Sequence, residues 1–418
     1  MLIKTILNKI VKFKCFIFHS CYWDVVNGLE SIIVEIHARK NSKAICSGCN
    51  SRQPGYDTLE SRLFQFPPLW GIPFFFQYAM RRVQCCHCGI IVEAVPWADG
   101  KNHLTHSYIW FLARWGKRLS WLEVSRIFRT SWDTVFRAIE EAVEWGLAHR
   151  SLDGITAIGV DEISIRRGHK YLTLVYEIGG NSKRLLWVNA DRTKKSFVKF
   201  FDFLGDERSE SLKFICSDMW KNYLDVIADR AKLAVNVLDR FHIIKMLNKK
   251  IDQVRAAEAK ALKKKGEADV LIRSRWCFLK RAENLTEKQY TKLSELVKYN
   301  LKTMRAYLLK EKFDFFWHYK SPAWAKKFFK KWCTQVMRSK IEPMKDFVKT
   351  MRNHETLIFN WFKARNSGIS LGAVEGLNNK ARVTTKKAYG YRTTRVAKIA
   401  LYHALGKLPE PESTHRFC

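Results

Sequence analysis

The chain has 418 residues, with 74 lysines and arginines against 40 aspartates and glutamates, which gives a net charge of +34. Apolar residues make up 47% of it, which excludes a disordered basic tail, and the length predicts roughly two to four domains. The basic residues are spread along the whole chain, and a positive field on a folded protein favours nucleic acid as a partner. No stretch approaches the ~20 apolar residues of a transmembrane helix, so we expect a cytoplasmic protein without a membrane partner.

Residues 1–100 predict a β-rich, zinc-binding domain. The segments KFKCFIF and SIIVEIHAR alternate between apolar and polar residues, as strands do. Two Cys-x-x-Cys pairs, Cys46/Cys49 and Cys85/Cys88, can present four thiolates to one tetrahedral structural zinc ion. Scattered reduced cysteines or a redox pair are the alternatives, and the neighbouring Cys86 and His87 leave the ligand set open.

Residues 101–150 predict a helix-turn-helix. The segment LEVSRIFRTSWDTVFRAI fits two short amphipathic helices, with Ser131 as the N-cap of the second. That second helix, with Arg137 on it, would lie in the major groove of DNA. An ordinary helical hairpin would give the same pattern.

Residues 151–240 predict the first part of an α/β core of ribonuclease-H-like type. Their order is three strands, helix, strand, helix, strand, and four of the apolar strand residues in KYLTLVYEI alternate onto one face. The run ITAIGV ends at Asp161, LKFIC ends next to Asp218, and LAVNVL closes on Asp239. Because ligands of open α/β sheets gather beyond the carboxyl ends of strands, Asp161 and Asp218 are candidate ligands of Mg²⁺, a hard ion that prefers oxygen.

Residues 367–418 predict the last part of this core. The segment LGAVEGLNNKARVTTKKAYGYRTTRVAKIA has a single acid, Glu375, among candidate DNA-binding residues: Asn379, Lys380, Arg382, Lys386, Lys387 and Arg392. In a helix from about Leu371, Glu375 would share a face with Asn378, Asn379 and Arg382, while Val374, Leu377 and Ala381 pack inward. Glu375 would then be a third metal ligand, unless it is an incidental surface residue. The ending LPEPESTHRFC is expected to be disordered.

Residues 241–366 show helical spacing without strand alternation, and they predict an all-α insertion in which Thr286 could cap a helix. The insertion is rich in basic residues and tryptophan. Trp276 and Trp324 could stack on bases, as aromatic platforms in basic grooves do, although a tryptophan in a helix is more often part of a core.

The motifs GVDE, CSDMW, DRFH and SGISLGAVEGLNNKAR resemble those of DDE transposases of bacterial insertion sequences, and most of all the ISL-three family, from about Cys46 to Gly406. The resemblance implies a transposase that binds double-stranded DNA at the terminal inverted repeats of its element, cleaves the ends and joins them to target DNA by strand transfer. It implies a catalytic triad of Asp161, Asp218 and Glu375 that holds two Mg²⁺ ions, for which Mn²⁺ may substitute, beside the structural Zn²⁺.

The same resemblance places Asp239 and His242 near the active site, with a buried structural pair as the alternative. It also implies a base stacked on an aromatic residue of the insertion, a homodimer or higher oligomer on DNA, and association with the bacterial nucleoid. The competing functions are a ribonuclease-H-like nuclease and a catalytically silent DNA-binding regulator.

Overall fold

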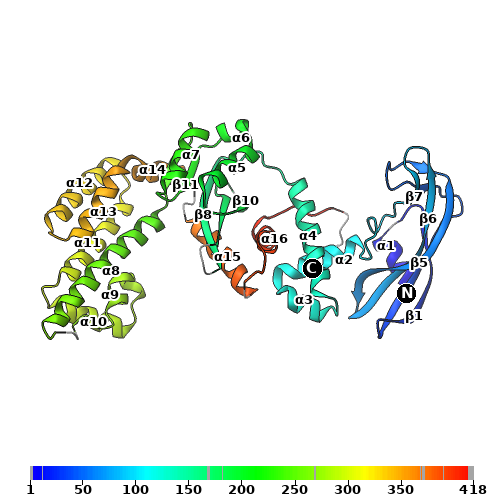
Figure 1. The fold of residues 1–418 in the computed structure, drawn as a ribbon, viewed down its shortest axis with the longest axis horizontal. Coiled ribbons are helices and arrows are strands. Elements are labelled where there is room, and N and C mark those ends of the chain that lie inside the picture. Colours follow the sequence, from blue (N-terminus) through cyan, green and yellow to red (C-terminus); the bar gives the residue numbers. More distant parts are fainter. Residues whose placement is uncertain are drawn as a thin grey trace. The chain divides into compact units, whose positions relative to one another are not determined.

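The structure is a computed structural model (Figure 1). It describes residues 3–11, 13–166, 170–180, 182–267, 270–367, 369, 372–388 and 390–412, without the side chains of 165, 166 and 170. The chain divides into two compact units, one of Met1–Ser151 with Thr384–Cys418 and one of Leu152–Val383. Among the helices in the described residues, none has the length and apolar character needed to cross a bilayer.

The N-terminal part of the first unit is a sheet with strand order β1-β2-β6-β5, to which β7 adds by pairing with β6 (Figure 1). Asn27 and Gly28 both have positive φ, as a tight hairpin turn between β1 and β2 requires. The core of the sheet is aromatic and includes Phe64, Phe76 and Trp97. The elements are α1 (Ile3–Ile10), β1 (Phe16–Val26), β2 (Leu29–Ala38), β3 (Ala44–Ile45), β4 (Arg52–Gln53), β5 (Gly55–Leu69), β6 (Ile72–Cys85) and β7 (Gly89–Val92). The predicted β-rich character of this region is therefore confirmed.

Helices make up the rest of the first unit: α2 (His106–Arg118), α3 (Trp121–Ile127), α4 (Trp132–His149) and α16 (Thr394–Leu405). Ser131 caps α4, because its side chain accepts a hydrogen bond from the backbone N–H of Thr134. The two helices and the cap predicted for the helix-turn-helix are thus present. Whether they bind DNA or form a plain helical hairpin stays a prediction.

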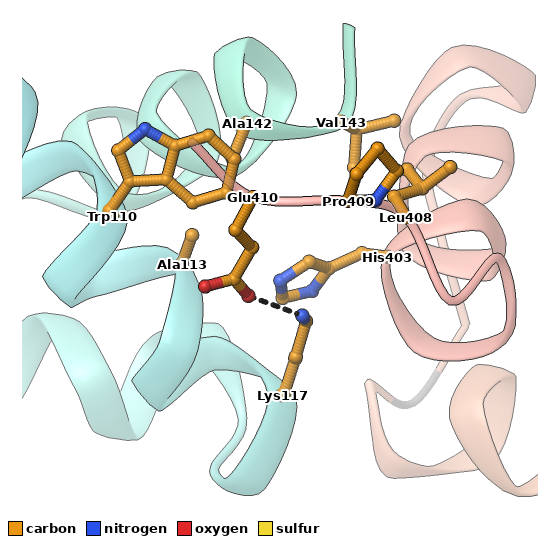
Figure 2. A pocket seen from close by; sticks show the side chains of 9 residues that line it. All are labelled: Trp110, Ala113, Lys117, Ala142, Val143, His403, Leu408, Pro409 and Glu410. Atoms are coloured by element: carbon orange, nitrogen blue, oxygen red, sulfur yellow. Dashed lines mark hydrogen bonds and ion pairs between the residues drawn. The ribbon is translucent and has the colours of Figure 1, made fainter. Parts of the chain in front are cut away.

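The start of the C-terminal tail is ordered, so the prediction that it is disordered is wrong for residues 408–410. Glu410 forms ion pairs with Arg114 at 2.9 Å and with Lys117 at 3.0 Å. Figure 2 shows the Glu410 and Lys117 side chains meeting beside the buried His403, in a pocket of about 10 Å³. These two ion pairs hold Glu410 in place, although the composition alone predicted a disordered segment. Residues 413–418 lie outside the described part of the chain.

The second unit is built on a five-stranded sheet with the order β10-β9-β8-β11-β12. The strands β8, β9 and β10 pair antiparallel, whereas β11 pairs parallel with both β8 and β12. Val175, Leu174 and Tyr176 of β9 are all buried, so this strand is covered on both faces rather than on the single face that alternation predicted. The elements are β8 (Ala157–Arg166), β9 (Lys170–Glu177), β10 (Arg184–Ala190), α5 (Lys194–Leu204), α6 (Asp206–Glu210), β11 (Phe214–Ser217), α7 (Lys221–Arg230) and β12 (Val235–Leu238).

An all-helical segment follows β12 and packs against it. The Asn360 side chain donates a 2.8 Å hydrogen bond to the backbone oxygen of Asn236, and Val237 belongs to the same apolar core as Trp332. Thr286 caps α10 in a capping box with Gln289, as predicted. The elements are α8 (Arg240–Lys264), α9 (Arg275–Leu279), η1 (Ala282–Asn284), α10 (Glu287–Val297), α11 (Lys302–Asp314), η2 (Phe315–His318), α12 (Pro322–Arg338), α13 (Glu342–Asn353), α14 (Glu355–Asn366) and then α15 (Ala373–Lys387).

Candidate active site

Asp161 lies in the middle of β8 rather than beyond its end, so the prediction that it follows the strand is wrong. The parallel pairing of β8 with β11 stops at Gly159 opposite Cys216, while the antiparallel pairing with β9 continues to Arg166. The β9 partner therefore keeps β8 extended after β11 has ended. Asp161 still lies just past the carboxyl end of the parallel part of the sheet, where ligands gather.

Asp161, Asp239 and His242 form a compact cluster in which one ligand atom from each lies within 4.8 Å of the others. The His242 Nε2 atom is 3.5 Å from Asp161 Oδ2 and 4.0 Å from Asp239 Oδ2. Asp239 is the N-cap of α8 and accepts a 2.9 Å hydrogen bond from the Phe241 backbone N–H. This cap fixes the first turn of α8, which carries His242 three residues later, toward β8.

Asp218 follows β11 directly, as predicted, and its Oδ1 accepts a 2.9 Å hydrogen bond from the Trp220 backbone N–H. Its other oxygen lies 3.4 Å from the Arg192 guanidinium, which also pairs with Glu162 at 3.0 Å. Arg192 stacks over the Trp220 ring at 4.8 Å. One positive charge of the chain is therefore shared between Asp218 and Glu162. Arg192 could not be predicted from the sequence, because no motif or spacing marks it.

Helix α15 brings Glu375 and Asn378 to the same region of the second unit. A side-chain carbon at Gly159 of β8 would collide with the Val374 side chain, so glycine allows the helix to approach the strand. The Asn378 amide donates to Asp161 Oδ2, and its oxygen accepts a 2.8 Å hydrogen bond from the Tyr176 hydroxyl. Glu375 itself is exposed. Asn378, predicted to share a face with Glu375, is only 2% exposed and is bound to Asp161.

The predicted inward face of this helix is otherwise confirmed, since Val374, Leu377 and Ala381 are buried. The starting residue expected for the helix, Leu371, lies outside the described residues.

The charges at these residues act on one another. Burial raises the pKa of Asp239 to about 6, and the charges of Asp161 and Glu375 push it in the same direction, against the Phe241 N–H and His242. Burial also raises the pKa of Asp218, although the Trp220 N–H, His242 and Arg192 oppose it. Such crowded, desolvated carboxylates are costly without a cation, and they are the arrangement in which divalent ions bind.

The pKa of His242 is also raised, although burial acts on this group in the opposite direction. Its burial would lower the pKa of the imidazole, but the hydrogen bond and charge of Asp161, with the charges of Asp239 and Asp218, raise it. Acids on three segments of the chain thus favour the cationic form of the ring.

The oxygen-rich donor set of Asp161, Asp218, Asp239 and Glu375 fits a hard divalent ion. Asp161 and Asp239 are joined at ligand distance, whereas Asp218 and Glu375 lie outside that three-residue cluster of the described chain and act on it through their charges. The assignment of Asp161, Asp218 and Glu375 as the catalytic triad stays a prediction.

The four predicted cysteines come together in the first unit. The Sγ atoms of Cys46, Cys49, Cys85 and Cys88 lie within 4.8 Å of one another, and neither Cys86 nor His87 is a member of this group. Hydrogen bonds from Ser51 and from Cys85 lower the pKa of Cys49 to about 6. The hydrogen bond with Cys46 and burial raise the pKa of Cys88 to about 12. Four cysteines from two Cys-x-x-Cys pairs at this spacing form a group that fits a tetrahedral Zn²⁺ ion.

The predicted DNA-binding residues lie on two units. Asn379, Lys380 and Arg382 belong to the second unit, and all three are exposed on α15. The other four predicted residues belong to the first unit and are exposed as well: Arg137, Lys386, Lys387 and Arg392. Trp276 is 53% exposed and Trp324 is 61% exposed, so neither is a core residue. Arg275 lies over the Trp276 ring at 5.4 Å and Lys327 over the Trp324 ring at 5.3 Å.

An α/β sheet with a cluster of acids where its parallel strands end is the arrangement of proteins that bind ligands at that edge of the sheet. A family model described as "Transposase", of the DDE type named for ISL3, matches residues 158–401. The chain belongs to the ISL3 family of DDE transposases, as the sequence motifs indicated.

Two relatives extend the likeness beyond the matched region. The transposase for insertion sequence element IS1557 of Mycobacterium tuberculosis is 28% identical over 404 residues, which cover 88% of this chain and 87% of the relative. The transposase for insertion sequence element IS1001 of Bordetella parapertussis is 25% identical over 364 residues, which cover 86% of this chain and 88% of the relative. Both relatives are therefore similar over more of this chain than residues 158–401.

Proposed function

We propose that this transposase binds the terminal inverted repeats of its insertion sequence, cleaves the DNA ends by metal-dependent hydrolysis and joins them to target DNA by strand transfer. The observation that carries the proposal is the ligand-distance cluster of Asp161, Asp239 and His242, on which the charges of Asp218 and Glu375 act. The names of the relatives and the matching family support it.

In this proposal Asp161, Asp218 and Glu375 bind two divalent ions, Mg²⁺ or Mn²⁺. When bound, such ions stabilise the charge of a phosphodiester displacement and activate the attacking oxygen. Asn378 positions the Asp161 carboxylate through the amide hydrogen bond that it donates. His242 lies between Asp161 and Asp239 and, when protonated, offsets the repulsion between the two carboxylates. The two steps use water and then the freed 3′-hydroxyl as nucleophiles.

The sheet order β10-β9-β8-β11-β12, with its single change from antiparallel to parallel pairing, supports a ribonuclease-H-like core with residues 241–366 as its helical insertion. The four cysteines would hold a structural Zn²⁺, and α3 with α4 would dock on DNA through Arg137. The exposed bases on α15 and after it, with Trp276 and Trp324, would contact the DNA backbone and bases. We propose a homodimer or higher oligomer as the assembly that pairs two ends in the bacterial nucleoid.

The test uses purified full-length protein and labelled element ends, with Mg²⁺ or with EDTA. Asp161→Ala and Glu375→Ala should bind the ends like the wild type but lose cleavage by at least about a hundredfold, because metal-ion stabilisation supplies several kcal/mol to the transition state. Asp225→Ala is the matched control, since Asp225 is an exposed acid on α7 of the same unit.

Cleavage by Asp161→Ala at the rate of Asp225→Ala would overturn the assignment of the acids. Wild-type protein that binds the ends but cuts nothing with Mg²⁺ or Mn²⁺ would favour the silent regulator. Cleavage of any branched or hybrid duplex without preference for the ends would favour the nuclease.

A further inference from the structure

We propose that His19, Glu35 and His37 form a second transition-metal site, on the outer face of the N-terminal sheet and separate from the four cysteines. One ligand atom from each of the three residues lies within 4.8 Å of the others. The His37 Nε2 atom is 3.2 Å from Glu35 Oε1, and the two imidazole rings lie 4.3 Å apart. The proposal does not depend on the transposase chemistry.

The fold of the sheet brings these side chains together from two strands. Glu35 and His37 are two residues apart on β2, so both project from the same face, while Val34 and Ile36 point into the core. On β1 the register with β2 is interrupted by a bulge between Phe18 and Cys21. His19 follows Phe18 at this bulge on the exposed side of β1, and its ring stacks on that of His37. Lys4 donates a hydrogen bond to the His19 backbone oxygen.

The geometry suits an ion bound by nitrogen and oxygen. In a tetrahedral site with ligands about 2.0–2.1 Å from the ion, neighbouring ligand atoms are about 3.3 Å apart. The separation of 3.2 Å between His37 Nε2 and Glu35 Oε1 matches this value. The rings of His19 and His37 lie within 12° of parallel, so one of them must rotate about its terminal torsion to aim a lone pair at the same ion. Both rings are exposed, which leaves room for that rotation.

The carboxylate is already oriented by its neighbours, as the outer partners of metal ligands usually are. The Ser20 hydroxyl donates a 2.6 Å hydrogen bond to Glu35 Oε2, which leaves Oε1 directed at His37. Two imidazoles and one carboxylate favour Zn²⁺ and its neighbours Ni²⁺ and Cu²⁺ over Mg²⁺, with water completing the coordination.

The test is a titration of full-length protein, first saturated with one equivalent of Zn²⁺ for the cysteine site, with Ni²⁺ followed by calorimetry. With Mg²⁺ in excess to occupy the acidic cluster around Asp161, the wild type should bind one further equivalent of Ni²⁺. His37→Ala and Glu35→Gln should each weaken that binding by at least about tenfold, and Ser20→Ala by about tenfold through loss of the outer hydrogen bond. Glu30→Ala on the same strand and His318→Ala in the other unit are controls that remove a matching exposed side chain outside the cluster.

Hydrogen exchange of residues 16–38 gives a second readout, because an ion that joins β1 to β2 should slow exchange at the bulge in the wild type and not in His37→Ala. The proposal is overturned if the wild type and the His19→Ala/His37→Ala double variant bind Ni²⁺ with the same stoichiometry and affinity. It is also overturned if only the cysteine variants change the titration.

Discussion

The close approach of α15 to β8 leads to a sharp prediction about Gly159. An alanine methyl at this position would lie far inside the contact distance of Val374 Cγ2, while Ile178 Cγ2 at 3.5 Å and Val374 Cβ at 3.6 Å would remain in ordinary contact. To restore a normal separation, the helix must move by about 1 Å from the strand. Gly159→Ala should therefore destabilise the packing by about 1–3 kcal/mol, the usual cost of overfilling a core.

The same movement should reach the candidate active site, because Glu375 and Asn378 lie on the displaced helix. A misplacement of about 1 Å can cost two orders of magnitude in rate, so end cleavage should fall by up to about a hundredfold while end binding is retained. Hydrogen exchange of β8 and α15 peptides would report the packing, and a gel-shift assay with a cleavage assay would report the function.

The matched test is the Val374→Ala variant, which removes the methyl groups that clash. Alone it should cost about 1–3 kcal/mol through lost burial. Combined with Gly159→Ala it should restore slow exchange and cleavage, with a favourable coupling of at least about 1 kcal/mol between the two positions. Additive losses in the double variant, or a Gly159→Ala protein with wild-type exchange and cleavage, would refute the argument that this contact positions Glu375.

Further predictions concern three other charged groups. The Glu93 side chain is fully buried and accepts hydrogen bonds from Tyr78 at 2.6 Å and from Arg81. Glu93→Ala should therefore destabilise the N-terminal sheet by about 3–5 kcal/mol, because it leaves the Arg81 charge without its partner. Faster hydrogen exchange in β6 would show this loss, and an unchanged exchange rate would contradict it. Burial, followed by the charge of Lys117, lowers the pKa of His403 from 6.5 to about 3. The folded protein favours the neutral imidazole, so the His403 contribution to the free energy of unfolding is fully present above pH 6.5. Below pH 6.5 the free energy of unfolding falls by up to about 1.4 kcal/mol per pH unit. His403→Gln should flatten that loss between pH 6.5 and 5 in thermal unfolding, and an equal slope in both proteins would exclude His403 as the cause. Arg192→Gln should tighten Mn²⁺ binding up to about fivefold, because a partly exposed ion pair with Asp218 contributes at most about 1 kcal/mol; weaker binding in a titration followed by electron paramagnetic resonance would show that Arg192 does not compete with the ion.

Much of the secondary structure could be predicted because it depends on neighbours in the chain. The caps Ser131 and Thr286 act within one helical turn, and the position of Asp218 follows from the end of one short apolar strand. Each cysteine pair could be predicted for the same reason, since Cys-x-x-Cys spacing brings two sulfurs together in any tight turn. Only the tertiary structure brings the two pairs together into one group of four.

The wrong predictions have a different cause, because the structure at each of these positions depends on contact with a distant segment of the chain. Asp161 appeared to end a strand because the apolar run ends there, but pairing with β9 extends β8 past it. The composition of the C-terminal tail predicted disorder. Glu410 nevertheless pairs with Arg114 and Lys117, which lie 296 and 293 residues away in the sequence. No local pattern contains such information.

By itself the sequence determined the family, the elements of the sheet and which residue types could bind metal ions, because motifs, periodicity and spacing are properties of short segments. Only the tertiary structure decided which acids stand at ligand distance and which side chains orient them. Asn378 reaches Asp161 across 217 residues, and that contact exists because Gly159 lacks a side chain that would keep α15 away from β8. Contacts of this kind depend on how two distant segments pack together, because the shape of one surface does not determine the shape of the other.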